Sequence, residues 1–493
     1  MPAMLTVAPV SFLGLAFALG ATGAPVHEQW SRFRGPDGAG LAPSGARLPS
    51  ALDPAKNRRW STAVPAGHSS PCLWGERLFV TGAVERELHT LCLDARDGRI
   101  LWKSSVTAAA LERPHEQNGL ASPTPTCDGE RVVSYFGSFG LVCHDLAGKE
   151  LWRRPLALPE NTFGTASSPV LVEKRLYFVS DANDSSYLEA IDPAEGKTLW
   201  RKDRAGFVSG WSTPGLWTSA AGPELLVYGA FQLTAYDPAD GRERWSIPGL
   251  ADEPIVVPVT GAGLVFVSSY NMKNNPDVMP LWTFEEVLVK HDHDGSGTIS
   301  KAECDENQSV LSRPDADGEG DHPLRIFWRF LDVDKSGEIT EEEWKKLVAW
   351  VDSWTHANGL VAVRPGSAEH PAEIAWQYPR GVPECPSPLY YDGRIYTVMN
   401  GGTVTCLDAK SGALHYQGRL EARGPYYASP VAGDGKVYAA SARGELSVFA
   451  AGDELKLLST HALDERLMST PALADGAVYV RTEEHVHAFG LPE

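Results

Sequence analysis

Two twelve-residue segments, DHDGSGTISKAE (292–303) and DVDKSGEITEEE (332–343), carry oxygen-bearing side chains at matching positions. At positions 1, 3, 5, 7, 9 and 12 stand Asp292, Asp294, Ser296, Thr298, Ser300 and Glu303 in the first, and Asp332, Asp334, Ser336, Glu338, Thr340 and Glu343 in the second. Calcium takes about six to eight oxygens, which the side chains at 1, 3, 5 and 12 and the carbonyl at 7 would supply. Position 9 would act through water, and glycine at 6 permits the turn. The spacing predicts two calcium sites; the alternative is a pair of acidic solvated loops without an ion.

Apolar residues at helical spacing flank these loops. They are Leu281, Phe284 and Leu288 before the first loop, Leu324, Phe327, Trp328 and Leu331 before the second, and Trp344, Leu347, Val348 and Val351 after it. Ser300 with Glu303 and Thr340 with Glu343 match the capping box, which begins a helix. The segment that follows the first loop is short and poorly amphipathic. The whole resembles a pair of EF-hands, a small all-α module in which Ile299 and Ile339 are placed to pair across the loops.

This module interrupts a repeat. Prolines that open an apolar stretch occur at 71, 125, 169, 214, 258, 388, 430 and 471, at intervals of 54, 44, 45, 44, 130, 42 and 41 residues. Each unit continues into a polar turn and a strand ending in an aromatic residue, as in CLDARDGRILW (92–102). Aspartate followed by glycine is typical of hairpin turns. Four antiparallel strands repeated eight times predict an all-β fold, an eight-bladed β-propeller.

The two ends of the chain are expected to complete one blade together. The segment NRRWSTAV (57–64) supplies a fourth strand without three predecessors, and EHVHAFG (484–490) is the third strand of a unit without a fourth. Their pairing would leave the ring without an open edge. The propeller then spans 57–270 and 358–490. The EF-hand insert, 271–357, lies in blade five between LVFVSSY (264–270) and GLVAVRP (359–365), on the face of the interblade loops beside the central funnel.

A series of tryptophans falls at one register of the outer strands. Its members are Trp60, Trp102, Trp152, Trp200, Trp245 and Trp376, with Tyr416 and Leu457 at the same register in blades six and seven. A large ring at that position can pack into the neighbouring blade. We therefore expect a structural role for the series rather than ligand binding.

The repeat LDxxxGxxLW and the opening WSRFRGPDGAG (30–40) resemble the pyrroloquinoline-quinone-type (PQQ-like) propeller repeat, over roughly residues 30–270 and 358–490. Quinoprotein dehydrogenases carry that repeat, and so do non-enzymatic relatives, including outer-membrane-protein assembly propellers. The resemblance implies the fold and leaves the activity open. The resemblance to the best-known dehydrogenases would imply a quinone held between a tryptophan and a disulfide of adjacent cysteines, and a calcium ion bound by Glu, Asn and Asp. None of the seven cysteines, at 72, 92, 127, 143, 304, 385 and 406, is adjacent to another.

Two functions follow as hypotheses. The favoured one is an exported, non-catalytic binding or scaffold propeller with two calcium ions and a protein or other extracytoplasmic partner. The alternative is a divergent PQQ-dependent oxidoreductase, although we do not expect the quinone. No GxSxG, HExxH or phosphate-binding glycine loop occurs. Polar or aromatic residues of the rim loops are His68, His115, Glu116, Asn118, Arg204, Trp211, Glu253, Glu384, Arg423, Tyr426 and Arg466, and we assign them no catalytic role.

Charge and the first residues bear on location. The net charge of −19 disfavours nucleic acid and anionic membranes as partners. More than half of it, −10, falls in residues 271–357, which hold 19 Asp and Glu against 9 Lys and Arg.

Residues 1–26 have no charged side chain and include an apolar run from Val7 to Ala21. We interpret residues 1–24 as a signal peptide, with an uncleaved anchor as the alternative, and expect a periplasmic or secreted protein without stable membrane insertion.

Overall fold

The computed structural model describes residues 30–491 apart from 114, 116, 173, 220–221, 272–274, 278–281, 305–327, 329–330, 354–357 and 368–369. The signal peptide predicted at 1–24 lies outside these residues. Among the described residues, no helix combines the length and the apolar character needed to cross a membrane.

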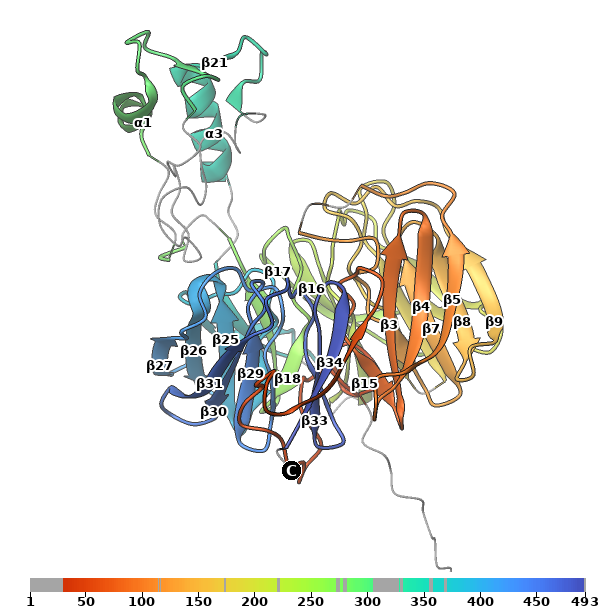
Figure 1. Ribbon diagram of the computed structural model, residues 1–493. Helices are drawn as coiled ribbons and strands as arrows, with labels where there is room; N and C mark the ends of the chain where they lie inside the picture. The colour runs from red at the N-terminus through yellow and green to blue at the C-terminus, as the bar shows by residue number, and fades with distance from the viewer. Residues whose placement is uncertain are drawn as a thin grey trace, which may run out of the picture.

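Eight four-stranded antiparallel sheets form a ring, which confirms the eight-bladed β-propeller (Figure 1). Blades one to four consist of β2 (Cys72–Trp74), β3 (Arg77–Val84), β4 (Glu87–Asp94) and β5 (Ile100–Thr107); β6 (Thr126–Cys127), β7 (Arg131–Phe136), β8 (Gly140–Asp145) and β9 (Glu150–Pro155); β10 (Val170–Val172), β11 (Arg175–Ser180), β12 (Tyr187–Ile191) and β13 (Thr198–Asp203); β14 (Gly215–Ser219), β15 (Gly222–Gly229), β16 (Gln232–Tyr236) and β17 (Glu243–Pro248). Blades five to eight consist of β18 (Val259–Gly261), β19 (Leu264–Ser269), β22 (Gly359–Arg364) and β23 (Glu373–Tyr378); β24 (Leu389–Tyr391), β25 (Arg394–Met399), β26 (Thr403–Asp408) and β27 (Leu414–Arg419), with the 3₁₀ turn η1 (Asn400–Gly402); β28 (Val431–Gly433), β29 (Lys436–Ala440), β30 (Glu445–Ala450) and β31 (Lys456–Ala462); β32 (Ala472–Ala474), β33 (Ala477–Arg481), β34 (His485–Gly490) and β1 (Arg58–Ala63).

Blade eight closes the ring, as the sequence predicted. Its strand order is β1-β34-β33-β32, so the first strand of the propeller pairs with the last. The pairing is antiparallel, with Thr62 opposite Val486. Asn57 adds a side-chain bond from Nδ2 to the carbonyl of Gly490, 2.8 Å away.

Hydroxyl groups next to the repeat prolines link the inner strands around the axis. In each link a backbone N–H donates a hydrogen bond to the side-chain oxygen of a Ser or Thr that precedes the inner strand of the next blade, at 2.9 or 3.0 Å. The seven links are Ser70 to Thr124, Thr124 to Ser168, Ser168 to Thr213, Val257 to Ser387, Ser387 to Ser429, Ser429 to Thr470 and Thr470 to Ser70. Blade five has Val257 at this position, which offers no hydroxyl; there Ser212 Oγ donates to the carbonyl of Val256 at 2.8 Å. The hydroxyls form a ring buried at the centre of the propeller.

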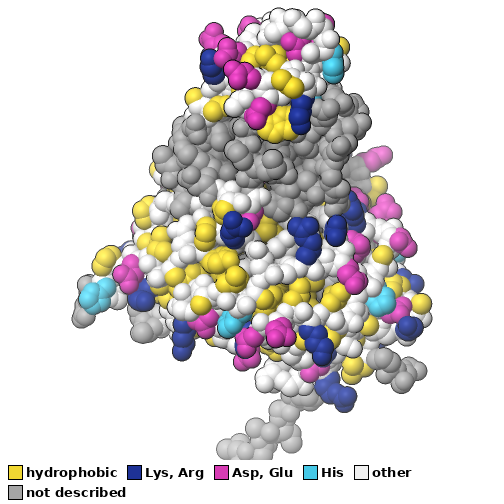
Figure 2. Space-filling model, turned by 90° about the vertical axis from the view of Figure 1, so that its left-hand side faces the viewer, with side chains coloured by type: hydrophobic (Ala, Val, Ile, Leu, Met, Phe, Trp, Pro, Cys, Tyr) yellow, Lys and Arg dark blue, Asp and Glu magenta, His cyan; other side chains and the backbone are white. Residues whose placement is uncertain are grey.

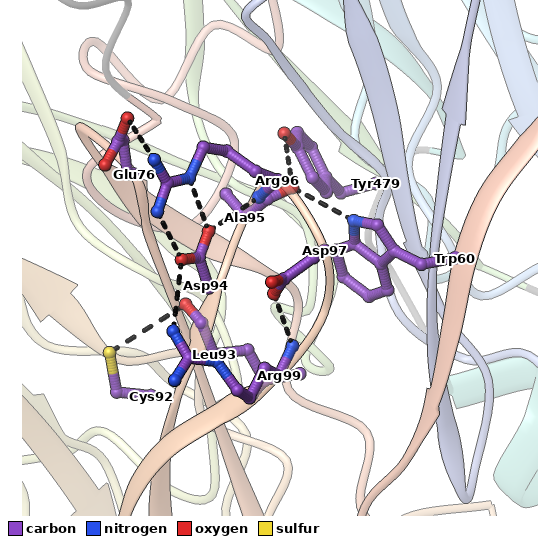
Figure 3. A network of polar contacts seen from close by, with 10 residues as sticks. All are labelled: Trp60, Glu76, Cys92, Leu93, Asp94, Ala95, Arg96, Asp97, Arg99 and Tyr479. Atoms are coloured by element: carbon purple, nitrogen blue, oxygen red, sulfur yellow. Dashed lines mark hydrogen bonds and ion pairs between the residues drawn. The ribbon is translucent and has the colours of Figure 1, made fainter.

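Five outer-strand tryptophans each dock their blade on the next one. The Trp60 indole N–H donates to the carbonyl of Ala95 at 3.0 Å, and Tyr479 Oη donates to the same carbonyl (Figure 3). Gly98 lies against the Trp60 ring, where an added Cβ would come within 2.5 Å, and its φ is +76°. The turn therefore requires glycine for both space and conformation. Trp102, Trp152, Trp200 and Trp376 repeat the docking bond to Leu146, Pro193, Pro238 and Ala409.

Trp245 departs from this pattern. Its indole N–H donates to Glu224 Oε2 of its own blade at 3.3 Å. Blade five, which follows it, joins β22 to β23 through a longer connection without the turn from Asp to Gly that receives the other tryptophans. Tyr416 and Leu457 pack partly buried in the core shared by blades six and seven, in keeping with the packing role expected of their register.

The segment 30–42 crosses the centre of the ring. Trp30 pairs with Leu73 of blade one, and the carbonyl of Ser31 accepts from the N–H of Cys127 in blade two at 2.8 Å. Arg34, fully buried, donates from Nη2 to the carbonyl of Pro388 in blade six at 2.9 Å. Ala42 then bonds to Ala432 in blade seven. This segment therefore ties blades one and two to blades six and seven.

The insert stands off one face of the propeller, between β19 and β22 (Figure 1). Its described elements are α1 (Phe284–His291), β20 (Ile299–Ser300), β21 (Glu338–Ile339) and α3 (Glu341–Ser353). A separate apolar core joins them, and the Trp344 indole N–H donates to the carbonyl of Trp282 at 3.0 Å. The insert therefore buries its own apolar face.

Removing residues 484–493 is expected to lower the melting temperature by about 10 °C or more, or to make the protein insoluble. The truncation removes β34, including buried Val486 and Phe489, and leaves β1 without its partner. Thermal unfolding followed by circular dichroism measures the effect. A chain ending at Leu491, which keeps β34 intact, is the control. Equal melting of the two chains would show that the terminal strands do not hold the ring together.

Candidate metal loops and the central cavity

The first acidic loop gathers its side chains around one point. Carboxylate oxygens of Asp292, Asp294 and Glu303 lie within 4.8 Å of one another. Asp292 Oδ2 accepts from the N–H of Gly297 at 2.9 Å, which closes the turn. Ser296 Oγ donates to the carbonyl of Thr298 at 3.1 Å, so the groups of positions 5 and 7 meet. The chain thus brings together the oxygen atoms that the spacing predicted.

The second loop repeats this arrangement. Oxygens of Asp332, Asp334 and Glu343 lie within 4.8 Å of one another, and Ser336 Oγ donates to the carbonyl of Glu338 at 3.1 Å. Asp332 Oδ1 is buried and makes no hydrogen bond. A carboxylate oxygen buried without a donor is costly unless a cation faces it. The donor set, of carboxylates, a hydroxyl and a carbonyl, suits calcium.

Position 12 of each loop is tied to position 9. Thr340 Oγ1 donates to Glu343 Oε2 at 2.9 Å and accepts from the Glu343 N–H, which is the predicted capping box at the start of α3. In the first loop, Ser300 donates from N–H and Oγ to Glu303 Oε2, both at 2.8 Å. These bonds from Ser300 lower the pKa of Glu303 to about 2. Position 9 thus orients the position-12 carboxylate in both loops.

The two loops form one unit. Ile299 and Ile339 pair across them and are fully buried, as the sequence predicted. Thr298 Oγ1 donates to Glu338 Oε2 at 3.0 Å, which joins the position-7 residues of the two loops. The short β20–β21 ladder therefore holds the two loops side by side.

The flanking helices differ in detail from the predicted stripes. In α1 the structure buries Phe284, Val287 and His291, with Leu288 only partly buried. Thr283 and Glu286 form a capping box that starts α1, a signal present in the sequence and missed. Trp344 and Leu347 of α3 are buried, as expected. Leu281, Leu324, Phe327 and most of the segment that follows the first loop lie outside the described residues, as does the side chain of Val351.

A cavity of about 520 Å³ opens at the centre of the propeller. It is lined mainly by connections that run from one blade to the next. Asn400, from the β25–β26 connection, joins them. The β25–β26 connection joins the second and third strands of blade six, and the insert joins the second and third strands of blade five. The mouth of the cavity and the insert therefore lie on the same face of the propeller. Phe33 of the crossing segment also lines the cavity.

Six of the eleven rim residues line this cavity: His68, His115, Asn118, Trp211, Glu253 and Glu384. Arg204 is instead buried in an ion pair with Asp181, with Nε and Oδ1 2.8 Å apart. Tyr426 is buried and donates to the carbonyl of Ala422. Arg423 and Arg466 do not belong to the lining, and Glu116 lies outside the described residues. The sequence analysis did not identify Phe33, Phe163, Tyr427 or the hydroxyls of the ring as cavity residues. The hydroxyls had a signal in the sequence, because a Ser or Thr directly precedes most of the repeat prolines.

Aromatic rings and one neutral histidine shape the cavity wall. The Phe163 and Trp211 rings lie 5.1 Å apart, and His115 meets Phe163 edge-on at 5.3 Å. Burial lowers the pKa of His68 to about 3, with smaller contributions from the charges of Arg481 and Arg466. His68 is therefore uncharged at neutral pH.

The seven cysteines, all in the described part of the chain, form no disulfide with one another, and Cys385 lines the cavity. Cys72, Cys92, Cys127, Cys143 and Cys406 are buried, as small residues between sheets are expected to be. Within the described part of the chain, clusters of three or more His, Cys, Asp or Glu side chains suited to a metal occur at the two loops and not in the cavity.

Solved structures share the fold at low sequence identity. BamB from Moraxella catarrhalis aligns with a TM-score of 0.52 and 12% identity, over 87% of this chain and 99% of that chain. A europium-containing methanol dehydrogenase gives 0.57 and 11%, over 94% and 98%. Quinohemoprotein alcohol dehydrogenase from Comamonas testosteroni gives 0.55 and 12%, over 94% and 82%. These likenesses show the propeller fold, which BamB and the two dehydrogenases share.

Family comparisons address the sequence directly. No curated protein matches the chain. The EF-hand family matches residues 329–348, which include the second loop. The family described as outer membrane protein assembly factor BamB matches residues 37–185, 184–275 and 372–457. Because these segments cover more than half of the chain, the protein belongs to this family of PQQ-like propellers.

Proposed function

We propose that the protein is an exported, non-catalytic binding module that holds two calcium ions in its insert and receives a partner on the cavity face. The observation that carries the proposal is the second loop, where buried Asp332 Oδ1 makes no hydrogen bond beside Asp334 and Glu343. The first loop supports it by repeating the same geometry. Asp292, Asp294, Ser296, Ser300 and Glu303 would serve one ion, with the carbonyl of Thr298.

The ions would fix the shape of the insert. Each loop offers three carboxylates and a serine, which corresponds to an affinity of roughly 10⁻⁶ to 10⁻⁴ M. Outside the cytosol such sites stay filled, so calcium would be structural rather than a signal. Figure 2 shows acidic side chains beside apolar ones on the surface of the insert, an arrangement suited to contact with another molecule.

The partner is proposed to be a protein or another extracytoplasmic ligand. Support comes from topology, because insert and cavity mouth share the face formed by the interblade connections. The insert would wall or gate the approach to the cavity. Export is part of this proposal and rests on the apolar, uncharged residues 1–26.

An oxidoreductase with pyrroloquinoline quinone is the second candidate, favoured by the likeness to dehydrogenases and by Trp211, Asn118 and two glutamates in the cavity. The lining does not fit the group. The quinone carries three carboxylates, yet none of the described lining residues is lysine or arginine. Cys385 has no adjacent cysteine with which to form the expected disulfide. We therefore derive no redox step.

Calcium titration by calorimetry is expected to show two ions per chain. Glu303→Gln and Glu343→Gln should each remove one ion, because position 12 supplies the bidentate carboxylate. Glu342→Gln is the matched control: Glu342 is exposed, stands beside Glu343 and pairs with Lys346. Absence of calcium uptake by the unaltered protein would refute the two sites.

Replacing residues 273–356 with a short Gly-Ser linker is expected to abolish calcium uptake and leave propeller melting unchanged. Ser269 and Gly359 are direct ladder partners, so a short linker can bridge them. Differential scanning calorimetry resolves the propeller transition. A drop of more than about 5 °C would contradict the independence of the two parts.

Incubation with pyrroloquinoline quinone and calcium, followed by gel filtration, is expected to leave no quinone absorbance on the protein. The physical reason is the excess of carboxylates over cations in the cavity. Retention of the chromophore near one per chain would overturn the non-catalytic assignment and favour the oxidoreductase.

A further inference from the structure

We propose that the central cavity binds the end of a neutral carbohydrate. This inference deepens the proposed function, on which it rests, because it assigns a ligand chemistry to the face that receives a partner. Three features carry it: a floor of hydroxyl groups, an apolar collar above that floor and an entrance on the face of the insert.

The seven hydroxyls of the ring line the cavity and form its floor. Each of these side chains is at most 5% exposed, and each accepts one backbone N–H from the preceding blade. A hydroxyl has one proton to donate and two lone pairs, so each keeps its proton and one lone pair. Within the described part of the chain, none of the seven donates that proton to another residue. A ligand that reaches the floor therefore meets groups that can each donate one hydrogen bond and accept another.

This floor suits a neutral ligand rich in oxygen. A sugar hydroxyl also donates and accepts, so it can pair with a floor hydroxyl in both directions. Serine and threonine carry no charge, and the described lining residues include no lysine or arginine that would hold an anion. His68, two residues before Ser70, is uncharged at neutral pH because burial lowers its pKa to about 3. The polar groups at the floor thus favour hydroxyl groups over an anion.

An apolar collar lies above the floor. Two positions before each ring position, every blade contributes a further lining residue. Blades three, four and five contribute Ala166, Trp211 and Ile255 there, and blade eight contributes Met468. The ring of Phe163 lies 5.1 Å from that of Trp211, which enlarges the aromatic surface. Because the faces of aromatic rings carry partial negative charge and attract C–H groups, the collar fits the C–H face of a sugar while the floor binds its hydroxyls.

The segment that crosses the ring closes the cavity below the hydroxyls. It bonds to Leu73, Cys127 and Ala432, which each stand two residues after a repeat proline, whereas the hydroxyls stand one residue before it. The segment therefore lies on the side of the ring away from the interblade connections, and Phe33 lines the cavity from there. Entry is from the face that carries the insert. A volume of about 520 Å³ falls within the range of ligand pockets, and a glycan can enter end first.

The test titrates the full calcium-loaded chain with the methyl glycosides of D-glucose, D-galactose and D-mannose, followed by saturation-transfer NMR. Tetrahydropyran-2-methanol, which keeps the sugar ring and lacks its ring hydroxyls, is the matched control ligand. At least one glycoside is expected to bind about tenfold more tightly than this control, because it forms further hydrogen bonds. Its affinity should be the same at low and high salt, since the ligand is neutral.

Three outcomes would overturn the proposal. Equal binding of the glycosides and the control ligand would show that the floor hydroxyls do not recognise oxygen. Binding of none of them would mean that the floor holds ordered water only. Tighter binding of D-gluconate, an anion, than of every glycoside would contradict the neutral ligand class.

Variants locate the site. Thr213→Val is expected to weaken glycoside binding about fivefold by removing one floor hydroxyl, and Thr213→Ser to restore it. The chain itself has Val257 at this position in blade five, so the ring tolerates valine. Trp211→Leu should weaken binding by removing the aromatic face. Thr90→Val is the matched control, because Thr90 is buried and donates to Ser134 Oγ at 2.9 Å outside the lining.

Circular dichroism checks that each variant is folded. Equal affinity of the Thr213→Val and Thr90→Val variants for the glycoside, together with equal affinity of the Trp211 variant, would place the sugar elsewhere and refute the site.

Calcium titration of the same samples separates this inference from the proposed function. Two calcium ions without sugar binding would refute the cavity ligand alone. Sugar binding without calcium uptake would refute the calcium sites alone. Retention of pyrroloquinoline quinone with no glycoside bound would overturn both the ligand class and the non-catalytic role.

Discussion

The ring of hydroxyl-to-amide hydrogen bonds at the axis is the interaction on which the rest of the molecule depends. Each link joins the start of one inner strand to the next, and each net bond contributes about 1 kcal/mol. Seven of the eight junctions between blades carry such a link. The N–H of Thr470 donates to Ser70, so one of these links joins blade one to blade eight, the blade made from both ends of the chain. The blade that joins the two ends of the chain is therefore held by the Thr470–Ser70 bond at its inner edge as well as by the pairing of β1 with β34.

The interruption of this ring coincides with blade five. The side chain of Val257 has no hydroxyl to accept a bond from the N–H of Thr213, while the bond from Ser212 Oγ to the carbonyl of Val256 repeats the one from Ser167 Oγ to the carbonyl of Ser212 one junction earlier. On the outer side, Trp245 lies against Gly366 of blade five but donates its indole N–H to Glu224 of its own blade. The junction of blades four and five therefore lacks both the hydroxyl link and the tryptophan bond to a turn of the next blade. Blade five, which carries the insert, is thus held to its predecessor with fewer of the repeated hydrogen bonds.

Features that belong to a repeat were predictable from sequence, including the pairing of β1 with β34 and of Ile299 with Ile339, whereas contacts made by a segment outside any repeat were not. The repeat prolines, the Asp-Gly turns and the calcium spacing each recur, so one copy supports another. Phe33 and Arg34 have no such copies: Arg34 contacts Pro388, more than 350 residues away, and no local pattern indicates that the segment crosses the ring. The residues that line the cavity could not be identified from sequence for the same reason. Arg204 and Glu253 are both polar residues of rim loops, yet Arg204 is buried in an ion pair with Asp181 and Glu253 lines the cavity.

Hydrogen bonds at the neck of the insert tie it to the propeller. Ser269 and Gly359 end the ladder of blade five, and Asn271 N–H donates to Asn358 Oδ1 at 3.0 Å just beyond it. Asp277 Oδ2 then accepts from the N–H of Gly381 at 2.6 Å, in the connection that carries Glu384 three residues later. This bond ties the neck of the insert to the loop that carries Glu384, so a displacement of Asp277 changes the hydrogen bonding of a loop that lines the cavity.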